Sequence, residues 1–214
     1  MRLTKQMVQR VLAEDDPWYI GNQVLYDLCR RHPQHTVNAE IIAKIWLIGR
    51  AYSASIERGR GNAAGSDLSN DRFYTEAVPD ALRKSRLDEK LKALARLKDA
   101  DESSIALGLG AHAHLVGLFH NLTSKSKRSL ASKYLHFHLP NHFFIYDSRA
   151  ASSIRSLGIP PRVISVPQEA DRRYAQFVGA AIGVREHVLS RFGERLSPRQ
   201  LDRVLLATFG ARDV

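Results

Sequence analysis

Apolar residues recur at helical spacing over almost the whole chain, and this pattern constrains the fold more than any other feature of the sequence. Met7, Val8, Val11 and Leu12 form one such set near the start, and positions three and four apart lie on one face of a helix. No convincing alternation of apolar and polar residues, the pattern typical of strands, is seen, although the β-branched segment "PRVISVP" favours a short extended stretch. We therefore expect an all-α protein.

Local stop signals divide this pattern into helices. A proline disfavours helical geometry in the residue before it, so "RHPQH" and "LGIPP" are expected to end helices, and the hydroxyl of Ser197 in "LSP" is placed to cap the last one. The expected helices span residues 3–14, 20–31, 37–58, 80–98, 103–121, 127–138, 148–157, 168–191 and 198–208.

The longest irregular segment lies at residues 58–73. It reads "RGRGNAAGSDLSNDRF", is rich in Gly, Asn and Ser, and is expected to be an exposed loop. A chain of 214 residues is long enough for a sizeable core without a metal or a disulfide. We expect residues 1–214 to form a single all-α domain, either undivided or with two lobes that comprise residues 1–60 and 74–214.

Charge and cysteine content bound the partner and the compartment. The net charge of +10 and the pI of about 10.0 favour a nucleic acid, because basic groups that neutralise phosphates release counterions. Cys29 is the only cysteine, which excludes an internal disulfide framework and a four-cysteine metal site. The start lacks the apolar core of a signal peptide, and no segment is expected to span a membrane. We expect a cytoplasmic monomer with no membrane partner.

Asp147 is the sole carboxylate of a long basic and apolar stretch. From Ser103 to Gln168 the chain holds seven Lys or Arg and six His, but only this one acid. A carboxylate at the start of "DSRAASSI" can cap a helix through backbone N–H groups. The apolar run "HFFIY" directly before it indicates in addition that the carboxylate lies near buried surface.

The helix before this aspartate is expected to present a narrow polar face. Ser129, Lys133 and His136 are spaced i, i+4 and i+7, which places them on one side of the helix at 127–138. The preceding "SKSKR" puts basic side chains beside free amides at a helix N-terminus, and both features attract phosphate. The residues expected to contact DNA are Ser124, Lys125, Lys127, Arg128 and Arg149.

These residues resemble the helix-hairpin-helix superfamily of DNA glycosylases, which includes MutY-type adenine glycosylases, endonuclease III and the 8-oxoguanine glycosylases. In that family an essential aspartate at a helix N-terminus follows the catalytic position of the preceding helix by 18 residues, and Ser129 and Asp147 stand 18 apart here. An alanine two residues after Ser129 and the approach "HFFIYD" match as well. The resemblance is local, and it covers this segment without a gap.

Two departures from the family pattern bear on the chemistry. The family's hairpin carries two glycines separated by one residue, where this chain has Lys125 and Lys127. Bifunctional members carry a lysine at the catalytic position, whereas this chain has Ser129, as MutY-type monofunctional members do. The resemblance therefore implies base removal without strand cleavage, and Lys133, one turn further on, is the alternative nucleophile.

The resemblance also implies a two-lobed helical fold and hydrolysis of the N-glycosidic bond of a damaged or modified base that is flipped out of double-stranded DNA. Asp147 would stabilise the positive charge that develops on the sugar, and stacking and polar contacts would hold the base. Candidate base-pocket residues are Trp46, Arg50 and Tyr52 on the helix at 37–58, with ordinary helix packing as the other interpretation. No cofactor is implied, and the histidine pairs in "HAH" and "HFH" point to different helix faces, which argues against a metal site.

Several alternatives stay open at this stage. The chain is either a glycosylase or a non-catalytic DNA-binding module that kept the scaffold and lost the chemistry with the hairpin glycines. The base is an oxidised guanine, a mismatched adenine, an alkylated purine or a hypermodified pyrimidine of phage DNA. The corresponding role is DNA repair or defence against phage with modified DNA.

Overall fold

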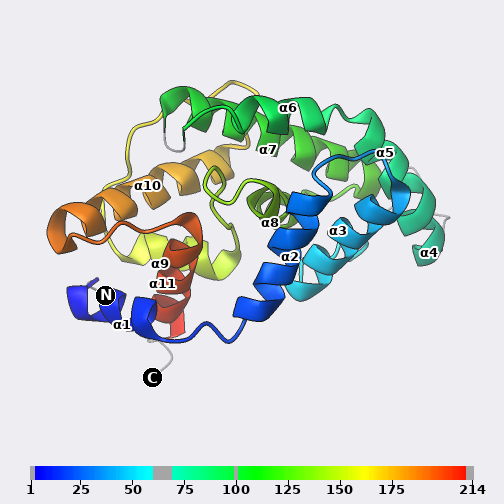
Figure 1. The fold of residues 1–214 in the computed structure, drawn as a ribbon. Helices are drawn as coiled ribbons and strands as arrows, with labels where there is room; N and C mark the ends of the chain where they lie inside the picture. The colour runs from blue at the N-terminus through cyan, green and yellow to red at the C-terminus, as the bar shows by residue number, and fades with distance from the viewer. Residues whose placement is uncertain (1–2, 60–68, 99–100, 211–214) are drawn as a thin grey trace.

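The computed structural model describes residues 3–59, 69–98 and 101–210, and every regular element within these ranges is helical (Figure 1). The all-α class predicted from the periodicity is therefore confirmed. The elements are α1 (Lys5–Ala13), α2 (Tyr19–Arg31), α3 (Asn38–Ala51), α4 (Asn70–Arg72), the π-helical turn η1 (Phe73–Ala77), α5 (Val78–Lys84), α6 (Leu87–Leu94), α7 (Glu102–Thr123), α8 (Arg128–His138), α9 (Ser148–Ser156), α10 (Arg172–Phe192) and α11 (Pro198–Gly210).

Two expected helices are shorter than predicted because the backbone turns inside them. The helix expected at 37–58 ends at Ala51, and the turn that follows has Ser53 in the left-handed region at φ 49°. The helix expected at 80–98 is divided into α5 and α6 by Arg86, which is also left-handed at φ 57°. Neither position is a glycine, so the sequence carries no signal for either break.

Side-chain caps fix other helix boundaries. Asp171 is the N-cap of α10, which begins at Arg172, four residues later than predicted, and the Asp171 side chain accepts a hydrogen bond from the backbone N–H of Tyr174. Ser197 and Gln200 cap the start of α11 reciprocally, as predicted for the serine. The helix α4 begins at Asn70, inside the segment predicted as a loop, and residues 60–68 of that segment lie outside the described residues.

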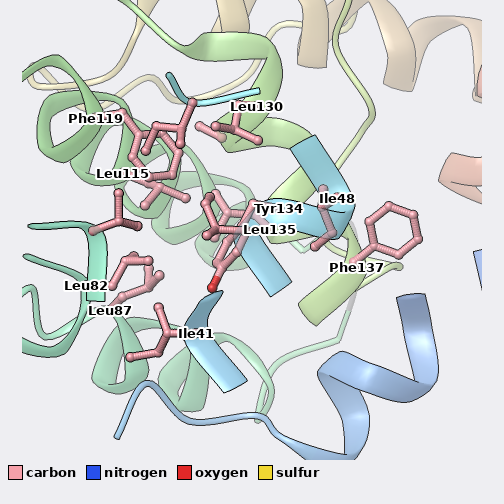
Figure 2. Close-up of a cluster of buried hydrophobic side chains, with 14 of the residues drawn as sticks. Ile41, Ile48, Leu82, Leu87, Leu115, Phe119, Leu130, Tyr134, Leu135 and Phe137 are labelled. Atoms are coloured by element: carbon pink, nitrogen blue, oxygen red, sulfur yellow. The ribbon is translucent and has the colours of Figure 1, made fainter. Parts of the chain in front are cut away.

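The first of two hydrophobic cores lies among α2, α3, η1, α5, α6, α7 and α8 (Figure 2). Ile41, Ile45 and Ile48 form a fully buried stripe on α3, and each such side chain stabilises the fold by about 1.5–3 kcal/mol relative to exposure. Tyr134 and Leu135 of α8 are also fully buried in this core. The helix that carries Lys133 is therefore held on most of its circumference.

The second core joins the N-terminal helix to the C-terminal half of the chain, with α1, α9, α10 and α11 around it. The segment expected to be extended lies across α10 without forming a strand, and the N–H of Arg162 donates to the carbonyl of Gly179 at 3.0 Å. A Cβ atom at Gly183 would lie 2.3 Å from the carbonyl oxygen of Pro160. Glycine is thus required where this segment crosses the helix.

One helix of the described residues, α7, is long and apolar enough to span a membrane, by its length and composition alone. It packs against α5, α6 and α8 and contributes Leu115 and Phe119 to the first core. This packing is consistent with a soluble protein.

The chain passes from the first core to the second immediately before Asp147. Phe143 belongs to the first core and Phe144 to the second, and α9 then packs against α10 and α11. Lys133 on α8 and Asp147 at the start of α9 consequently lie where the two cores meet.

Candidate functional site

Asp147 caps α9, as its sequence position suggests. Its backbone is extended at φ −147°, and its Oδ1 accepts a hydrogen bond from the N–H of Ala150 at 2.8 Å. Phe143, Phe144 and Ile145 of the preceding apolar run are buried. Asp147 itself keeps 19% side-chain exposure, so its second oxygen remains available to another group.

Lys133 is that neighbouring group. Its side chain is 4% exposed, and its Nζ lies 3.9 Å from Oδ2 of Asp147 and donates to Oγ of Ser129 at 2.9 Å. Burial lowers the pKa of Lys133, and the charge of Asp147 opposes that shift. A lowered pKa increases the neutral fraction of an amine, which is the form that attacks carbon.

Two cavities meet at this pair. A cavity of about 400 Å³ is lined by Ser126, Arg128, Ser129, Tyr146 and Ser148, and a second of about 570 Å³ extends toward α2 and α11. Five residues line both cavities: Tyr52, Ser53, Lys133, Asp147 and Arg149. The pair is therefore accessible from a space large enough for a small ligand.

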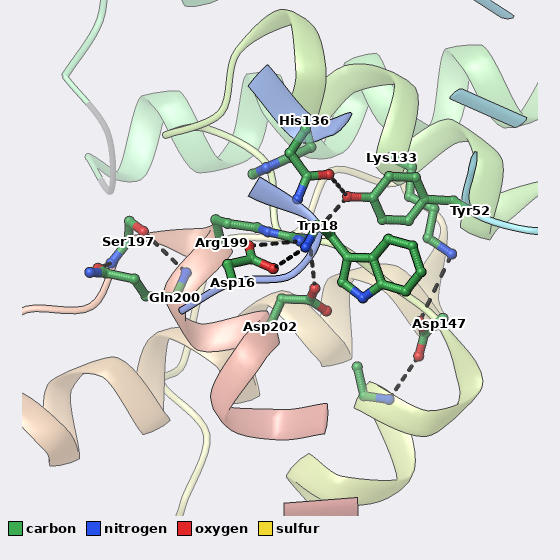
Figure 3. Close-up of polar contacts among 12 residues, drawn as sticks. Asp16, Trp18, Tyr52, Lys133, His136, Asp147, Ser197, Arg199, Gln200 and Asp202 are labelled. Carbon is green, nitrogen blue, oxygen red and sulfur yellow. Dashed lines mark hydrogen bonds and ion pairs between the residues drawn. The ribbon is translucent and has the colours of Figure 1, made fainter. Parts of the chain in front are cut away.

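The far wall of the larger cavity carries a charged network (Figure 3). Nη1 of Arg199 donates to Oη of Tyr52 at 3.0 Å and to Oδ2 of Asp202 at 3.2 Å. Nη2 of Arg199 lies 3.5 Å from Oδ2 of Asp16. Burial raises the pKa of Asp202 to about 7, although the Arg199 charge opposes this shift and the Asp147 charge adds to it.

The structure brings together the three residues that the sequence suggests for catalysis: Ser129, Lys133 and Asp147. Of the three candidate base-pocket residues, Tyr52 lines both cavities. Trp46 and Arg50 line neither, and Arg50 forms an ion pair at 2.7 Å with a glutamate of the turns after α3. Asp147 is also not the only carboxylate near the site, because α11 supplies Asp202.

The residues expected to contact DNA differ in their freedom to do so. Lys125 and Arg149 are exposed, and Arg149 lines both cavities. Lys127 donates to the backbone carbonyl of Arg58 at 2.5 Å, and Arg128 forms a two-point ion pair with Asp171, the N-cap of α10. Ser124 is the left-handed C-cap of α7, so its role is first a structural one.

The larger cavity is also lined by residues that the sequence does not predict for the site, among them Trp18, Asn22, Arg199 and Asp202. Asp202 is 3% exposed and stands beside buried Leu201 on α11. The one sequence signal that could have indicated Asp202 is the position of an acidic residue next to the apolar face of a helix. Trp18 follows the helix-stop "DDP" and has no periodic neighbour that would mark it.

The described residues contain no group of three or more His, Cys, Asp or Glu side chains that could hold a metal ion. The histidine pairs are engaged elsewhere. His112 stacks on Tyr174 with ring centres 3.7 Å apart, and His136 shares a 2.7 Å hydrogen bond with Tyr26.

No family model matches the chain, and no curated protein or solved structure matches it either. The site's own geometry and chemistry therefore carry the functional argument.

Proposed function

We propose that this protein is a DNA glycosylase that hydrolyses the N-glycosidic bond of a modified base flipped out of duplex DNA. The observation that carries the proposal is the pair of Lys133 and Asp147, 3.9 Å apart at the junction of two cavities. The resemblance to helix-hairpin-helix glycosylases is supported by two consecutive helices, α7 and α8, that are joined by a short turn, and by a next helix that begins at the aspartate. Two hydrophobic cores that meet at the site support a two-lobed arrangement.

Asp147 has the properties required for the chemical step. Breaking the glycosidic bond develops positive charge on the deoxyribose, which a fixed carboxylate stabilises. The cap to Ala150 fixes one oxygen and leaves the other at the cavity. The same carboxylate can orient a water molecule for attack on the sugar.

The exposed face near the site is suited to a phosphate backbone. Lys125 precedes α8, and Arg149 lies in the first turn of α9. The N-terminus of α9 adds backbone N–H groups and the positive end of the helix dipole. With a net charge of +10, this face favours binding that weakens as salt increases.

The decisive experiment is the release of free base from a mixed panel of duplexes, each with one oxidised, mismatched, alkylated or pyrimidine-modified base, measured by mass spectrometry. The wild type is expected to release at least one of these bases and Asp147→Asn none at a comparable rate. DNA binding without release from any duplex would instead identify a non-catalytic binding module.

A second candidate activity, strand cleavage through Lys133, is favoured by the buried amine beside Asp147. If Lys133 attacks C1′ of the sugar, the new N–C1′ bond forms as the glycosidic bond to the base breaks. The nitrogen then loses a proton and the C1′–O4′ bond breaks, which opens the sugar ring and gives an imine that borohydride reduces to a stable crosslink. Base release without a crosslink indicates the monofunctional reaction inferred from Ser129. A crosslink that disappears in Lys133→Met indicates the bifunctional one.

A further inference from the structure

Three polar atoms around the larger cavity have no hydrogen-bond partner among the described residues. They are Nδ2 of Asn22, Nε of Arg199 and Oδ1 of Asp202. Asn22 and Asp202 are only 6% and 3% exposed. Buried polar groups are ordinarily paired, so three unpaired buried atoms on residues that line one cavity point to a ligand that supplies the missing partners.

The surrounding hydrogen bonds decide which of these atoms donate. Arg199 can only donate, so Oη of Tyr52 accepts from it and must direct its own proton elsewhere. That proton goes to Oδ1 of Asn22 at 2.7 Å, which leaves Nδ2 as the unpaired donor. Oδ2 of Asp202 is likewise engaged by Arg199. The unpaired set therefore consists of two donors and, when Asp202 is ionised, one acceptor.

Trp18 gives the same cavity an aromatic wall. The residue lines the cavity and is 72% exposed. Its backbone N–H donates to Oδ1 of Asp16 at 3.0 Å, and the other oxygen of Asp16 faces Arg199 at 3.5 Å. The loop before α2 is thus tied to α11. An exposed tryptophan in such a position can stack on a planar base.

We propose that this cavity receives the flipped base, that Trp18 stacks on it, and that Asn22 and Asp202 select an edge with one N–H between two carbonyl groups. Such an edge is found in uracil, thymine and their 5-substituted derivatives. The proposal rests on the glycosylase function proposed above and names the substrate class of that site. Of the base classes that the sequence leaves open, it selects the modified pyrimidines.

The choice follows from matching donors to acceptors. Two carbonyl oxygens complement the two unpaired donors, and the N–H complements the carboxylate of Asp202. Adenine offers one acceptor and one donor, and guanine offers one acceptor and two donors, so each leaves a group of the cavity unpaired. Cytosine has the right number of groups, but its amine is a weaker donor to a carboxylate than a ring N–H between two carbonyls. A cationic methylated purine would bring positive charge toward Arg199 and Lys133.

The test is single-turnover base release from duplexes that each contain one uracil, 5-hydroxymethyluracil, cytosine, adenine mismatch, 8-oxoguanine or N7-methylguanine. The two uracil-type bases are expected to be released at least about tenfold faster than the others. A base that leaves a buried polar group of the cavity unpaired is released more slowly by about this factor or more. Asp202→Asn replaces the acceptor by an amide that can donate. It should lower uracil release at least about tenfold relative to cytosine release.

Further variants separate recognition from folding. Asn22→Asp removes the unpaired donor and should also lower uracil release. Trp18→Ala should raise KM for uracil-containing duplexes, whereas Trp46→Ala, which alters a tryptophan outside the cavity, should not. The circular dichroism melting curve of each variant shows whether it folds.

The outcomes are distinguishable. Faster release of a purine or of cytosine by the wild type, or a base preference that is unchanged in both Asp202→Asn and Asn22→Asp, would overturn the assignment of these readers and leave the glycosylase function standing. Absence of release from every duplex would overturn the proposed function itself, and the assignment with it.

Discussion

Replacement of Asp202 by asparagine is expected to make the stability of the fold less dependent on pH. Asp202 is 3% exposed, and burial raises its pKa to about 7 from an ordinary value of 3.8. A difference of about three pKa units corresponds to about 4 kcal/mol between the protonated and ionised forms. This is an upper bound for the effect of a single group on the unfolding free energy.

The sign follows from the direction of the shift. A carboxyl group whose pKa is higher in the folded protein contributes stability below its unfolded pKa and loses that contribution as the pH rises through the folded value. Between pH 5 and pH 8 the wild type should lose about 3 kcal/mol of unfolding free energy relative to Asp202→Asn. The asparagine does not titrate, and its carbonyl can still accept the hydrogen bond from Arg199.

The assay is urea unfolding of both proteins at pH 5, 6, 7 and 8. The charged groups that face Asp202 from other elements are present in both proteins, so their own titration largely cancels in the difference. They are Asp16, Lys133, Asp147 and Arg149. Asp171→Asn is the matched control, because the pKa of Asp171 is lowered and its titration lies below this pH range. A pH-independent difference between wild type and Asp202→Asn would refute the reasoning.

Three further predictions test other parts of the structure. Arg149→Ala should weaken duplex binding and reduce the salt dependence of that binding by about one phosphate contact, which fluorescence anisotropy at several salt concentrations measures. Lys127→Ala should change duplex binding less, because backbone carbonyls occupy the Lys127 amine. Gly183→Ala should lower the unfolding free energy by about 1–3 kcal/mol or more, because the new Cβ meets a backbone oxygen at 2.3 Å. Arg128→Ala breaks a two-point ion pair whose side chains are 20% and 10% exposed, and it should lower the unfolding free energy by about 1–3 kcal/mol. Denaturant titration measures the change in unfolding free energy for both Gly183→Ala and Arg128→Ala.

The helices could be predicted from the sequence because their signals are local. The apolar stripe of α3 and the proline and serine at the start of α11 are read within one helix. The breaks at Ser53 and Arg86 could not be predicted, since each depends on a left-handed backbone that tertiary contacts impose on an ordinary residue.

The candidate site divides in the same way. Ser129 and Lys133 lie one turn apart on α8, so their proximity follows from helix geometry. Trp18 and Asp202 line the same cavity although they are far apart in the sequence. Only packing of α11 near the loop before α2 brings them together, and periodicity within one helix contains no information about that contact.

The most direct test of the central claim is the single-turnover rate of base release by Asp147→Asn on the duplex that the wild type processes best. Asparagine is also a good N-cap, so the start of α9 should be preserved. Loss of the negative charge should slow release about 100- to 1000-fold, with duplex affinity largely unchanged. If the variant released the base as fast as the wild type, Asp147 would not be the carboxylate that stabilises the sugar cation.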